Sequence, residues 1–161
     1  MRRRAEIKLS SELGANPESV WARVVDPAGI NDELRPLLRM TVPRGAADFG
    51  LDGIRPGRIG RSRLLLFGFI PFDYDDLNVV RVEPGRGFLE RSSMLSMRLW
   101  EHERTLEPLD EGRCRLTDRV AWEPRLPLPG TWLRPLVGFV FRHRHKRLRL
   151  HYASEPDAPR S

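Results

Sequence analysis

The fold is decided by residues 131–152, TWLRPLVGFVFRHRHKRLRLHY. Apolar side chains recur there with three- and four-residue spacing, which predicts one continuous amphipathic helix about 33 Å long at about 1.5 Å per residue. Arg144 interrupts the apolar stripe between Phe141 and Leu148. A helix of this kind needs an apolar surface, which the rest of the chain must supply. The stripe consists of Leu133, Leu136, Val137, Val140, Phe141, Leu148 and Tyr152.

The other flank of this helix is strongly basic. It carries Arg142, His143, His145, Lys146, Arg147 and Arg149. The helix contains none of the 22 acidic residues, and its basic residues account for the net charge of +6. One interpretation is an anionic partner such as a lipid surface, bound through Arg142, Lys146, Arg147 and Arg149. The simpler interpretation is a solvated helix face, and binding of nucleic acid is not expected.

Length and composition indicate a soluble globular protein. A chain of 161 residues favours one domain, which we expect over residues 1–153, with a loose polar tail at 154–161. Its single cysteine, Cys114, excludes an intramolecular disulfide and suits a reducing compartment, so we expect a cytoplasmic location. No apolar run approaches the roughly 20 residues of a membrane span. The basic N-terminus lacks the apolar core of a secretory signal.

Local patterns predict two short helices and seven strands. A first strand at residues 4–10 is followed by a helix that Asn16-Pro17-Glu18 opens, and the stretch Asp26–Gly29 ends it. A second short helix is expected around Asn31–Leu38. The remaining strands are expected at 38–42, 58–67, 72–83, 88–93, 97–108 and 113–123, with connections rich in proline and glycine at 43–56, 84–87 and 124–130.

The last two strands form a hairpin whose register follows from residue alternation. A three-residue loop, Asp110-Glu111-Gly112, with its glycine in the left-handed conformation, would close the hairpin. In the resulting register, apolar residues face one another across the two strands and arginines face acidic residues. A shift of one residue would move every side chain to the opposite face. On the apolar face this register pairs Trp100 with Trp122, His102 with Val120, Arg104 with Asp118 and Leu106 with Leu116. On the other face it pairs Glu103 with Arg119 and Glu107 with Arg115.

The apolar face of this hairpin also carries three polar groups. Its Trp, Leu and Val side chains place it inside the protein, so Arg104, Asp118 and His102 also point inward. An unpaired buried charge is very costly, and Arg104 with Asp118 forms the required pair. Two interpretations remain open. The pair either braces the sheet or forms a polar patch in an otherwise apolar cavity.

The order of elements resembles that of a known superfamily. A strand, two helices, six strands and a long last helix are similar to START/Bet v 1-like (SRPBCC) proteins, in particular a bacterial branch labelled polyketide cyclase/dehydrase-like. The resemblance covers nearly the whole chain. Its carriers are Asn16-Pro17-Glu18-Ser19-Val20-Trp21, the two-helix insert, Trp100-Glu101-His102-Glu103-Arg104, Leu116-Thr117-Asp118-Arg119-Val120 and Phe141-Arg142-His143-Arg144-His145-Lys146-Arg147-Leu148.

This resemblance implies an α+β helix-grip fold. In that fold a seven-stranded antiparallel sheet wraps around the long C-terminal helix, two short helices follow the first strand, and a hydrophobic cavity often lies between sheet and last helix. Superfamily members bind lipids, hormones or polyketides, and only some are enzymes. The expected ligand-binding residues are Tyr74, Trp100, His102, Arg104, Asp118, Trp122, Phe141 and Arg144.

Several kinds of chemistry can be weighed from the residues. The four His and one Cys lack metal-ligand spacing, so neither a metal nor another cofactor is expected. His102 is the candidate acid/base residue, because imidazole titrates near neutrality. The run Asp73-Tyr74-Asp75-Asp76 offers a cation site or a general base, although we expect a solvated strand end. Arg144 is placed to reach the Arg104–Asp118 pair or an acidic ligand group.

Three functions follow from these observations. The first is binding of a small hydrophobic or amphipathic ligand between the sheet and the last helix, without catalysis. The second is a cyclase- or dehydratase-like lyase that acts on a polyketide-type substrate through His102. The third is an interaction protein that docks through its basic helix.

Overall fold

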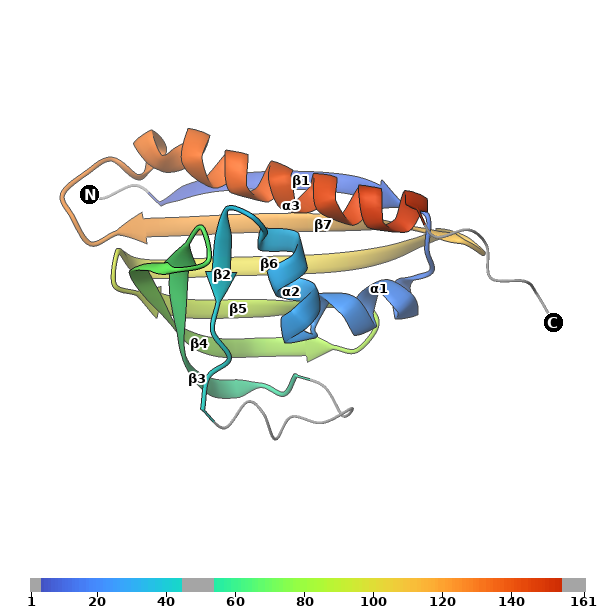
Figure 1. Cartoon of the computed structure of the whole chain (residues 1–161), viewed down its shortest axis with the longest axis horizontal. Helices are drawn as coiled ribbons and strands as arrows, with labels where there is room; N and C mark the ends of the chain where they lie inside the picture. Colours follow the sequence, from blue (N-terminus) through green and yellow to red (C-terminus); the bar gives the residue numbers. More distant parts are fainter. Residues whose placement is uncertain (1–3, 45–53, 155–161) are drawn as a thin grey trace.

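A long C-terminal helix lies across a curved antiparallel sheet in the computed structural model (Figure 1), which describes residues 4–44 and 54–154. The seven strands follow the order β1-β7-β6-β5-β4-β3-β2. They are β1 (Ala5–Leu13), β2 (Leu38–Met40), β3 (Gly57–Leu66), β4 (Ile70–Glu83), β5 (Gly87–Met94), β6 (Met97–Asp110) and β7 (Arg113–Pro124). The helices are α1 (Pro17–Val24), α2 (Pro27–Leu34), the 3-10 turn η2 (Gly130–Leu133) and α3 (Arg134–Ser154). The predicted helix-grip α+β fold is therefore confirmed.

The predicted last helix is present, with a 3-10 turn in place of its first residues. Its stripe packs on the sheet through buried side chains, among them Val137, Phe141, Leu148 and Tyr152. Leu136 is an exception, because it is 61% exposed. It lies one residue, or about 100° around the helix, from Val137 and so points away from the sheet.

The predicted register of the last hairpin is confirmed at all six pairs. Its closure differs, because the strands continue to an Asp110–Arg113 pair and leave a two-residue turn, Glu111-Gly112. A bulge between Pro108 and Asp110 absorbs the extra residue that the predicted three-residue loop contained. Gly112 is not among the described glycines with positive φ, so the left-handed conformation predicted for it was wrong.

The two short helices are capped by side chains. Asn16 accepts a hydrogen bond from the Ser19 amide, 2.8 Å away, as predicted. Asp26, expected to end the first helix, instead caps α2 by accepting from the Gly29 amide at 3.1 Å. The second helix therefore spans Pro27–Leu34, and the prediction of Asn31–Leu38 was wrong. The predicted tail at residues 154–161 lies almost entirely outside the described residues.

The apolar core divides into two clusters along α3. One gathers around Leu148 and Tyr152 and includes Leu13, Val20 and Leu116. The other gathers around Val137 and Phe141 and includes Ala5, Val120 and Trp122. Buried charged residues, described below, occupy the stretch of α3 between these clusters. Packing of α3 thus combines two apolar contacts with a polar centre.

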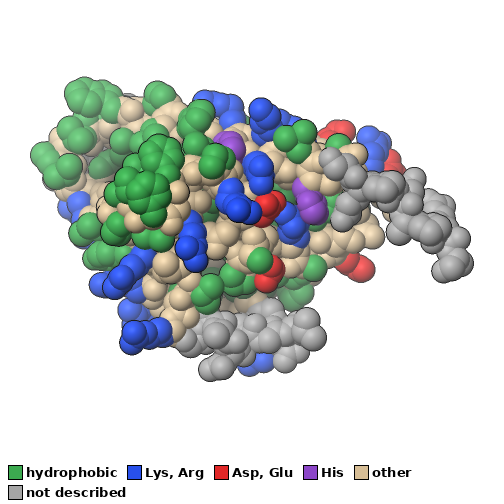
Figure 2. Space-filling view, in the orientation of Figure 1, with side chains coloured by type: hydrophobic (Ala, Val, Ile, Leu, Met, Phe, Trp, Pro, Cys, Tyr) green, Lys and Arg blue, Asp and Glu red, His purple; other side chains and the backbone are tan. Residues whose placement is uncertain are grey.

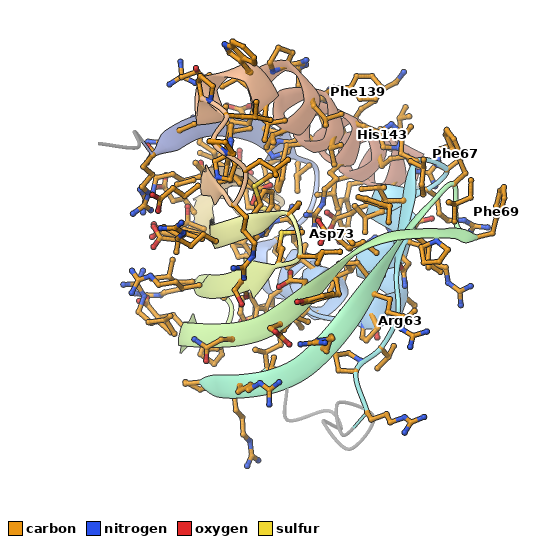
Figure 3. All side chains as sticks on the ribbon, turned by 90° about the vertical axis from the view of Figure 1, so that its left-hand side faces the viewer. Arg63, Phe67, Phe69, Asp73, Phe139 and His143 are labelled. Carbon is orange, nitrogen blue, oxygen red and sulfur yellow. The ribbon has the colours of Figure 1, made fainter. Side chains whose placement is uncertain are left out.

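Exposed apolar side chains gather at one end of the molecule, which we call the apolar end. Figure 2 shows them at the left, over the tip of the β3–β4 hairpin and the start of α3, with Lys and Arg side chains beside them. Figure 3 views this end face on, with Phe67 and Phe69 projecting from the hairpin. The apolar end consists of Phe67, Phe69, Ile70, Phe72, Leu95, Leu126, Leu128, Trp132, Leu136 and Phe139.

Candidate functional site

Arg104 is the centre of a buried ion network between the sheet and the helices. Its Nε lies 2.7 Å from Asp118 Oδ1 and its Nη2 lies 2.8 Å from Asp118 Oδ2, which makes a two-pronged contact across β6 and β7. Its Nη1 also donates to both carboxylate oxygens of Glu33 on α2, at 3.0 and 3.1 Å. All three side chains are 1% exposed. The Arg104–Asp118 pair was expected, but its extension to Glu33 was not.

Two residues of α3 complete this network. Arg144 Nε donates to Glu33 Oε2 at 2.9 Å, so the predicted interruption of the apolar stripe pairs with α2. His145 lies 2.9 Å from Asp118 Oδ2 through Nε2 and 2.7 Å from Ser11 Oγ through Nδ1. His145 is buried, so its predicted place on a solvated basic flank was wrong. His145 follows Arg144 directly in α3, about 100° further around the helix, and the curved sheet covers both side chains.

The network is balanced in charge. Burial alone would raise the pKa of Asp118, but the charge of Arg104 and the contacts with Arg104 and His102 together hold this pKa well below its usual range. Burial acts on Glu33 in the same way, and Arg104 and Arg144 together lower the pKa of Glu33. Two arginines therefore face two carboxylates whose oxygens are occupied by protein donors. This geometry favours a structural brace over a ligand site.

The expected catalytic residue belongs to the same network. His102 is 4% exposed, and its Nε2 lies 2.8 Å from Asp118 Oδ1. Its ring contacts Phe88 and Phe141 edge-on, at centroid distances of 5.3 and 5.1 Å. These contacts fix the imidazole on both sides.

The aromatic residues expected to bind a ligand instead fill the helix–sheet interface. Trp122 is fully buried, and its indole donates to the Gly130 carbonyl at 2.9 Å. Trp100 is half-buried beside Phe141, with ring centroids 6.3 Å apart. Together they attach the start of the last helix to the end of the sheet.

A cavity of about 710 Å³ lies between the sheet and the two short helices, over strands β2 to β5, and we call it the inner cavity. Its walls come from α1, α2, β2 and the loop after it, β3, β4 and β5. No residue of α3 lines it among those described, whereas a cavity was expected between the sheet and the last helix. Space remains between the α1–α2 pair and the strands beneath it, whereas α3 packs directly on β1 and β7. Its principal apolar lining residues are Trp21, Val25, Ile30, Met40, Leu77, Val79 and Phe88.

Two carboxyl groups lie at the polar part of this region. Glu90 lines the inner cavity, is 8% exposed, and accepts a hydrogen bond from Ser92 Oγ at 2.8 Å. Asp75 is 4% exposed and lies on the neighbouring strand β4, opposite Ser62, which also lines the cavity. Asp75 Oδ1 has no hydrogen-bond partner. Burial, reinforced by the negative charge of Glu90, raises the pKa of Asp75 to about 10, so Asp75 keeps its proton at neutral pH.

These acids correct two predictions about β4. Asp73 and Asp75 do lie on the face of Leu77 and Val79, but they are buried and not at a solvated strand end. Asp73 accepts hydrogen bonds from the amide and the hydroxyl of Ser96. Tyr74 points to the opposite face, where its ring lies 3.9 Å from the Arg61 guanidinium, so it does not line the cavity.

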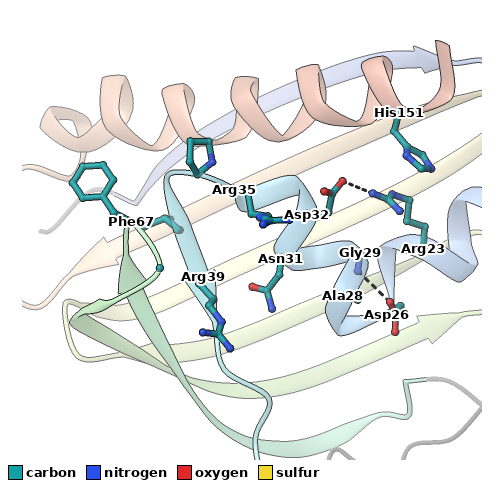
Figure 4. Close-up of a pocket in the computed structure, with 13 residues that line it drawn as sticks. Arg23, Asp26, Ala28, Gly29, Asn31, Asp32, Arg35, Arg39, Phe67 and His151 are labelled. Atoms are coloured by element: carbon teal, nitrogen blue, oxygen red, sulfur yellow. Dashed lines mark hydrogen bonds and ion pairs between the residues drawn. The ribbon is translucent and has the colours of Figure 1, made fainter. Parts of the chain in front are cut away.

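A second hollow, of about 870 Å³, lies on the outer side of α2 (Figure 4). Its lining is largely charged, and includes Arg23, Asp32, Arg35 and Arg39. Arg23 pairs with Asp32, which also accepts from Arg147 at 3.0 Å. Because Asp32 is already held by two arginines, we assign the ligand site to the inner cavity.

Within the described ranges, no group of three or more His, Cys, Asp or Glu side chains is arranged to hold a metal ion. No described helix is both long and apolar enough to cross a membrane.

Comparisons with known structures agree on the fold. A protein from Chromobacterium violaceum, CV1439, aligns with a TM-score of 0.71 and 18% identity over 93% of this chain and 99% of its own. A START superfamily protein from Mycobacterium smegmatis aligns with a TM-score of 0.68 and 18% identity over 92% and 97%. The Zhui aromatase/cyclase from Streptomyces aligns with a TM-score of 0.69 and 14% identity over 94% of both chains. At these identities the likeness is one of fold, and it confirms the expected similarity in fold to START/Bet v 1-like proteins and to an aromatase/cyclase.

The sequence itself matches one family model. No curated protein matches the sequence of this chain. The family model described as "Domain of unknown function (DUF8410)" matches residues 11–152, from the end of β1 to the last turn of α3. The chain therefore belongs to the DUF8410 family, with the helix-grip fold of the START/Bet v 1 superfamily.

Proposed function

We propose that the protein binds a small apolar or amphipathic ligand in the inner cavity. The observation that carries the proposal is a volume of about 710 Å³ lined mainly by apolar side chains. Ligand pockets of drug-sized molecules typically occupy about 300–1,000 Å³ and combine apolar walls with a few polar groups. The ligand would thus lie under α1 and α2, and not against the last helix.

The charges of the lining restrict the class of ligand. Asp26, at the rim, and Glu90 are the only charged residues among the described lining residues, although the whole chain carries a net charge of +6. A ligand carboxylate or phosphate would meet no cation there and would lie near Asp75 and Glu90. An amine could instead take the place of the Asp75 proton and form a charge-assisted hydrogen bond. We therefore propose a ligand with an amine or a neutral polar head and an apolar body.

Filling the inner cavity should weaken binding of an apolar probe. Leu77→Trp enlarges a half-buried wall residue, and we expect it to weaken Nile red binding at least about tenfold, because one occupied subsite removes roughly 1.4 kcal/mol or more of apolar contact. The matched control is Val80→Trp on the same strand, since Val80 is 42% exposed and does not line the cavity. Fluorescence titration measures both affinities. Equal affinities in the two variants would show that the probe binds elsewhere.

The head-group preference has its own test. Dodecylamine should displace Nile red at concentrations about tenfold lower than dodecanoate, since only the amine gains a charge-assisted contact with the acid pair. Glu90→Gln should remove most of that difference while leaving Nile red affinity unchanged. If dodecanoate competed better, the proposed ligand class would be wrong.

A cyclase- or dehydratase-like enzyme is the second candidate. Its support is the acid pair, because a carboxyl group with a raised pKa at an apolar cavity can donate a proton near neutral pH. His102 does not line the cavity, whereas Glu90 does and Asp75 lies opposite the lining residue Ser62, so this candidate now rests on Glu90 and Asp75. Turnover of polyketide-type substrates that Glu90→Gln abolishes, without loss of probe binding, would distinguish an enzyme from a carrier.

His102 should behave as a structural residue. We expect His102→Ala to lower the free energy of unfolding by about 1–3 kcal/mol, because Asp118 loses one of its donors. Nile red affinity should stay unchanged, since the imidazole lies outside the cavity lining. Urea denaturation and the same titration check the two parts. Unchanged stability with lost binding would return His102 to the ligand site.

A further inference from the structure

The apolar end gathers most of the exposed large hydrophobic residues of the described ranges. Ten of the thirteen large hydrophobic residues that are exposed in the described ranges belong to it, and their exposed fractions run from 43% for Ile70 and Leu128 to 72% for Phe69. Contiguous exposed apolar surfaces commonly mark sites of interaction with a protein or a membrane. The fold therefore presents a surface that the inner cavity does not explain.

Hydrogen bonds hold the hairpin tip beside α3. The Phe67 amide donates to the Leu37 carbonyl at 2.8 Å, and His143 Nε2 lies 2.5 Å from the Arg35 carbonyl. The turn after α2 thus links the hairpin to the helix face on which Phe139 stands, four residues before His143. Figure 3 shows Phe67, Phe69, Phe139 and His143 at this same end.

The connector between β7 and α3 joins the same surface. The Arg125 amide donates to the Ser96 carbonyl at 3.0 Å, and the Leu95 amide donates to the Tyr74 carbonyl at 3.3 Å. Leu126 and Leu128 follow Arg125, and Phe72 precedes Tyr74 by two residues. Strands β3, β5 and β7 end here while β4 and β6 begin, so the turns between them form one continuous surface.

The three segments that build this end carry only positive charge. The parts of these segments that lie towards the apolar end, residues 34–40, 61–72 and 125–143, contain two, two and three Arg residues respectively, and no Asp or Glu. Several of these side chains are exposed next to the apolar residues, namely Arg35, Arg39, Arg63, Arg134 and Arg142. Aromatic and aliphatic side chains that project from an arginine-rich rim suit the boundary between lipid head groups and acyl chains.

We propose that the apolar end docks the protein on an anionic lipid bilayer. Phe67, Phe69 and Trp132 enter the head-group region, while the surrounding arginines bind anionic lipid heads. A second copy of the chain fits this surface less well. A two-fold contact would bring the same arginine-rich rims face to face without any acid between them.

This surface differs from the basic helix flank expected from the sequence. Arg147 is held by Asp32, and Arg149 donates to Ser11 Oγ at 2.8 Å, so these two residues already have protein partners. Arg142 is exposed and lies near the apolar end, one turn after Phe139. The arginines of α3 that are free to contact an anionic surface therefore lie near its beginning, and not in its middle as the sequence suggested.

Vesicle sedimentation tests this proposal. The protein should bind vesicles that contain phosphatidylglycerol, should bind phosphatidylcholine vesicles much more weakly, and should lose part of the binding as salt rises. Phe69→Ser and Trp132→Ser should each weaken binding to anionic vesicles about tenfold, because each removes a large inserted ring. The matched controls are Val80→Ser and Leu150→Ser, which change exposed apolar residues outside the apolar end.

Each outcome decides the question. Failure to bind anionic vesicles, or equal losses in the test and control variants, would overturn membrane docking. Sedimentation velocity tests the remaining alternative, which is self-association through the apolar end. A dimer that Phe69→Ser or Trp132→Ser dissociates would show that a second copy covers the apolar end. Nile red binding in the inner cavity should be unaffected by either variant, so failure of this proposal would be separate from failure of ligand binding.

Discussion

Arg104→Met is expected to lower the free energy of unfolding by about 3–5 kcal/mol, because it leaves buried carboxylates without their main cation. Arg104 is 1% exposed and contacts Asp118 and Glu33 through five hydrogen bonds. A loss of that size is a large part of the roughly 5–15 kcal/mol that stabilises a typical fold. Urea denaturation followed by tryptophan fluorescence measures it.

The same network provides the controls for Arg104→Met. Adding Glu33→Gln and Asp118→Asn to this variant should restore part of the lost stability, since no buried carboxylate then remains unpaired. Arg119→Met changes an arginine of the outer Glu–Arg ladder on the same hairpin and should cost no more than about 1 kcal/mol. Equal effects of Arg104→Met and Arg119→Met would show that the interior pair contributes no more than a surface pair.

Asp75→Asn is expected to stabilise the protein, and the gain should grow with pH. The pKa of Asp75 is raised in the folded state, so its favourable contribution is complete below the unfolded pKa of about 3.9 and is lost progressively as pH rises towards the folded pKa. The amide introduced by this substitution needs no proton and can donate to the Glu90 carboxylate. We expect a gain on the order of 2 kcal/mol in alkaline solution and little gain near pH 4.

Urea denaturation at about pH 5, 7 and 9 checks this slope. Asp76→Asn is the matched control, because Asp76 lies next in the strand but faces outward and pairs with Arg61 at 3.0 Å. Its effect should not grow with pH, since Arg61 lowers the pKa of Asp76. Asp118 and Glu33 have the opposite sign to Asp75: their lowered pKa values give stability above about pH 4 that is lost in acid. If Asp75→Asn destabilised equally at every pH, Asp75 would be an ionised and paired group.

Alternation along strands was sufficient to predict the register of the last hairpin, although not its closing turn. Its pairs are local in sequence and mix charged and apolar residues so sharply that one register satisfies them all, as Arg104 with Asp118 and Trp100 with Trp122 show. The same alternation put Asp75 on the face of Leu77, and separated both from Tyr74. The misplaced expectation was that acids at a strand end are solvated.

The rest of the site depends on contacts that no local pattern contains. Glu33 and Arg104 are 71 positions apart, and their pairing requires α2 to lie over β6. No sequence pattern marked Glu33 as a buried residue. The helix that carries it was also predicted four residues too late in the chain. The inner cavity is harder still to predict, because it depends on the distance at which α1 and α2 stand from the sheet. Sequence patterns show which side chains share a face, but not how much space remains above them.

The grip of two arginines on Glu33 also bears on how a ligand would enter and leave. Lifting α2 off the cavity would separate the buried Glu33 from Arg104 and Arg144, at a cost of about 3–5 kcal/mol. The wall that β2 forms is weaker, since β2 contributes three residues, pairs only with β3 among the described strands, and is joined to α2 by two neutral hydrogen bonds between Asn31 and the Met40 backbone. Local opening of such an edge is far cheaper than global unfolding. The residence time of a ligand would then be set by an edge strand, independently of the charges that hold the fold together.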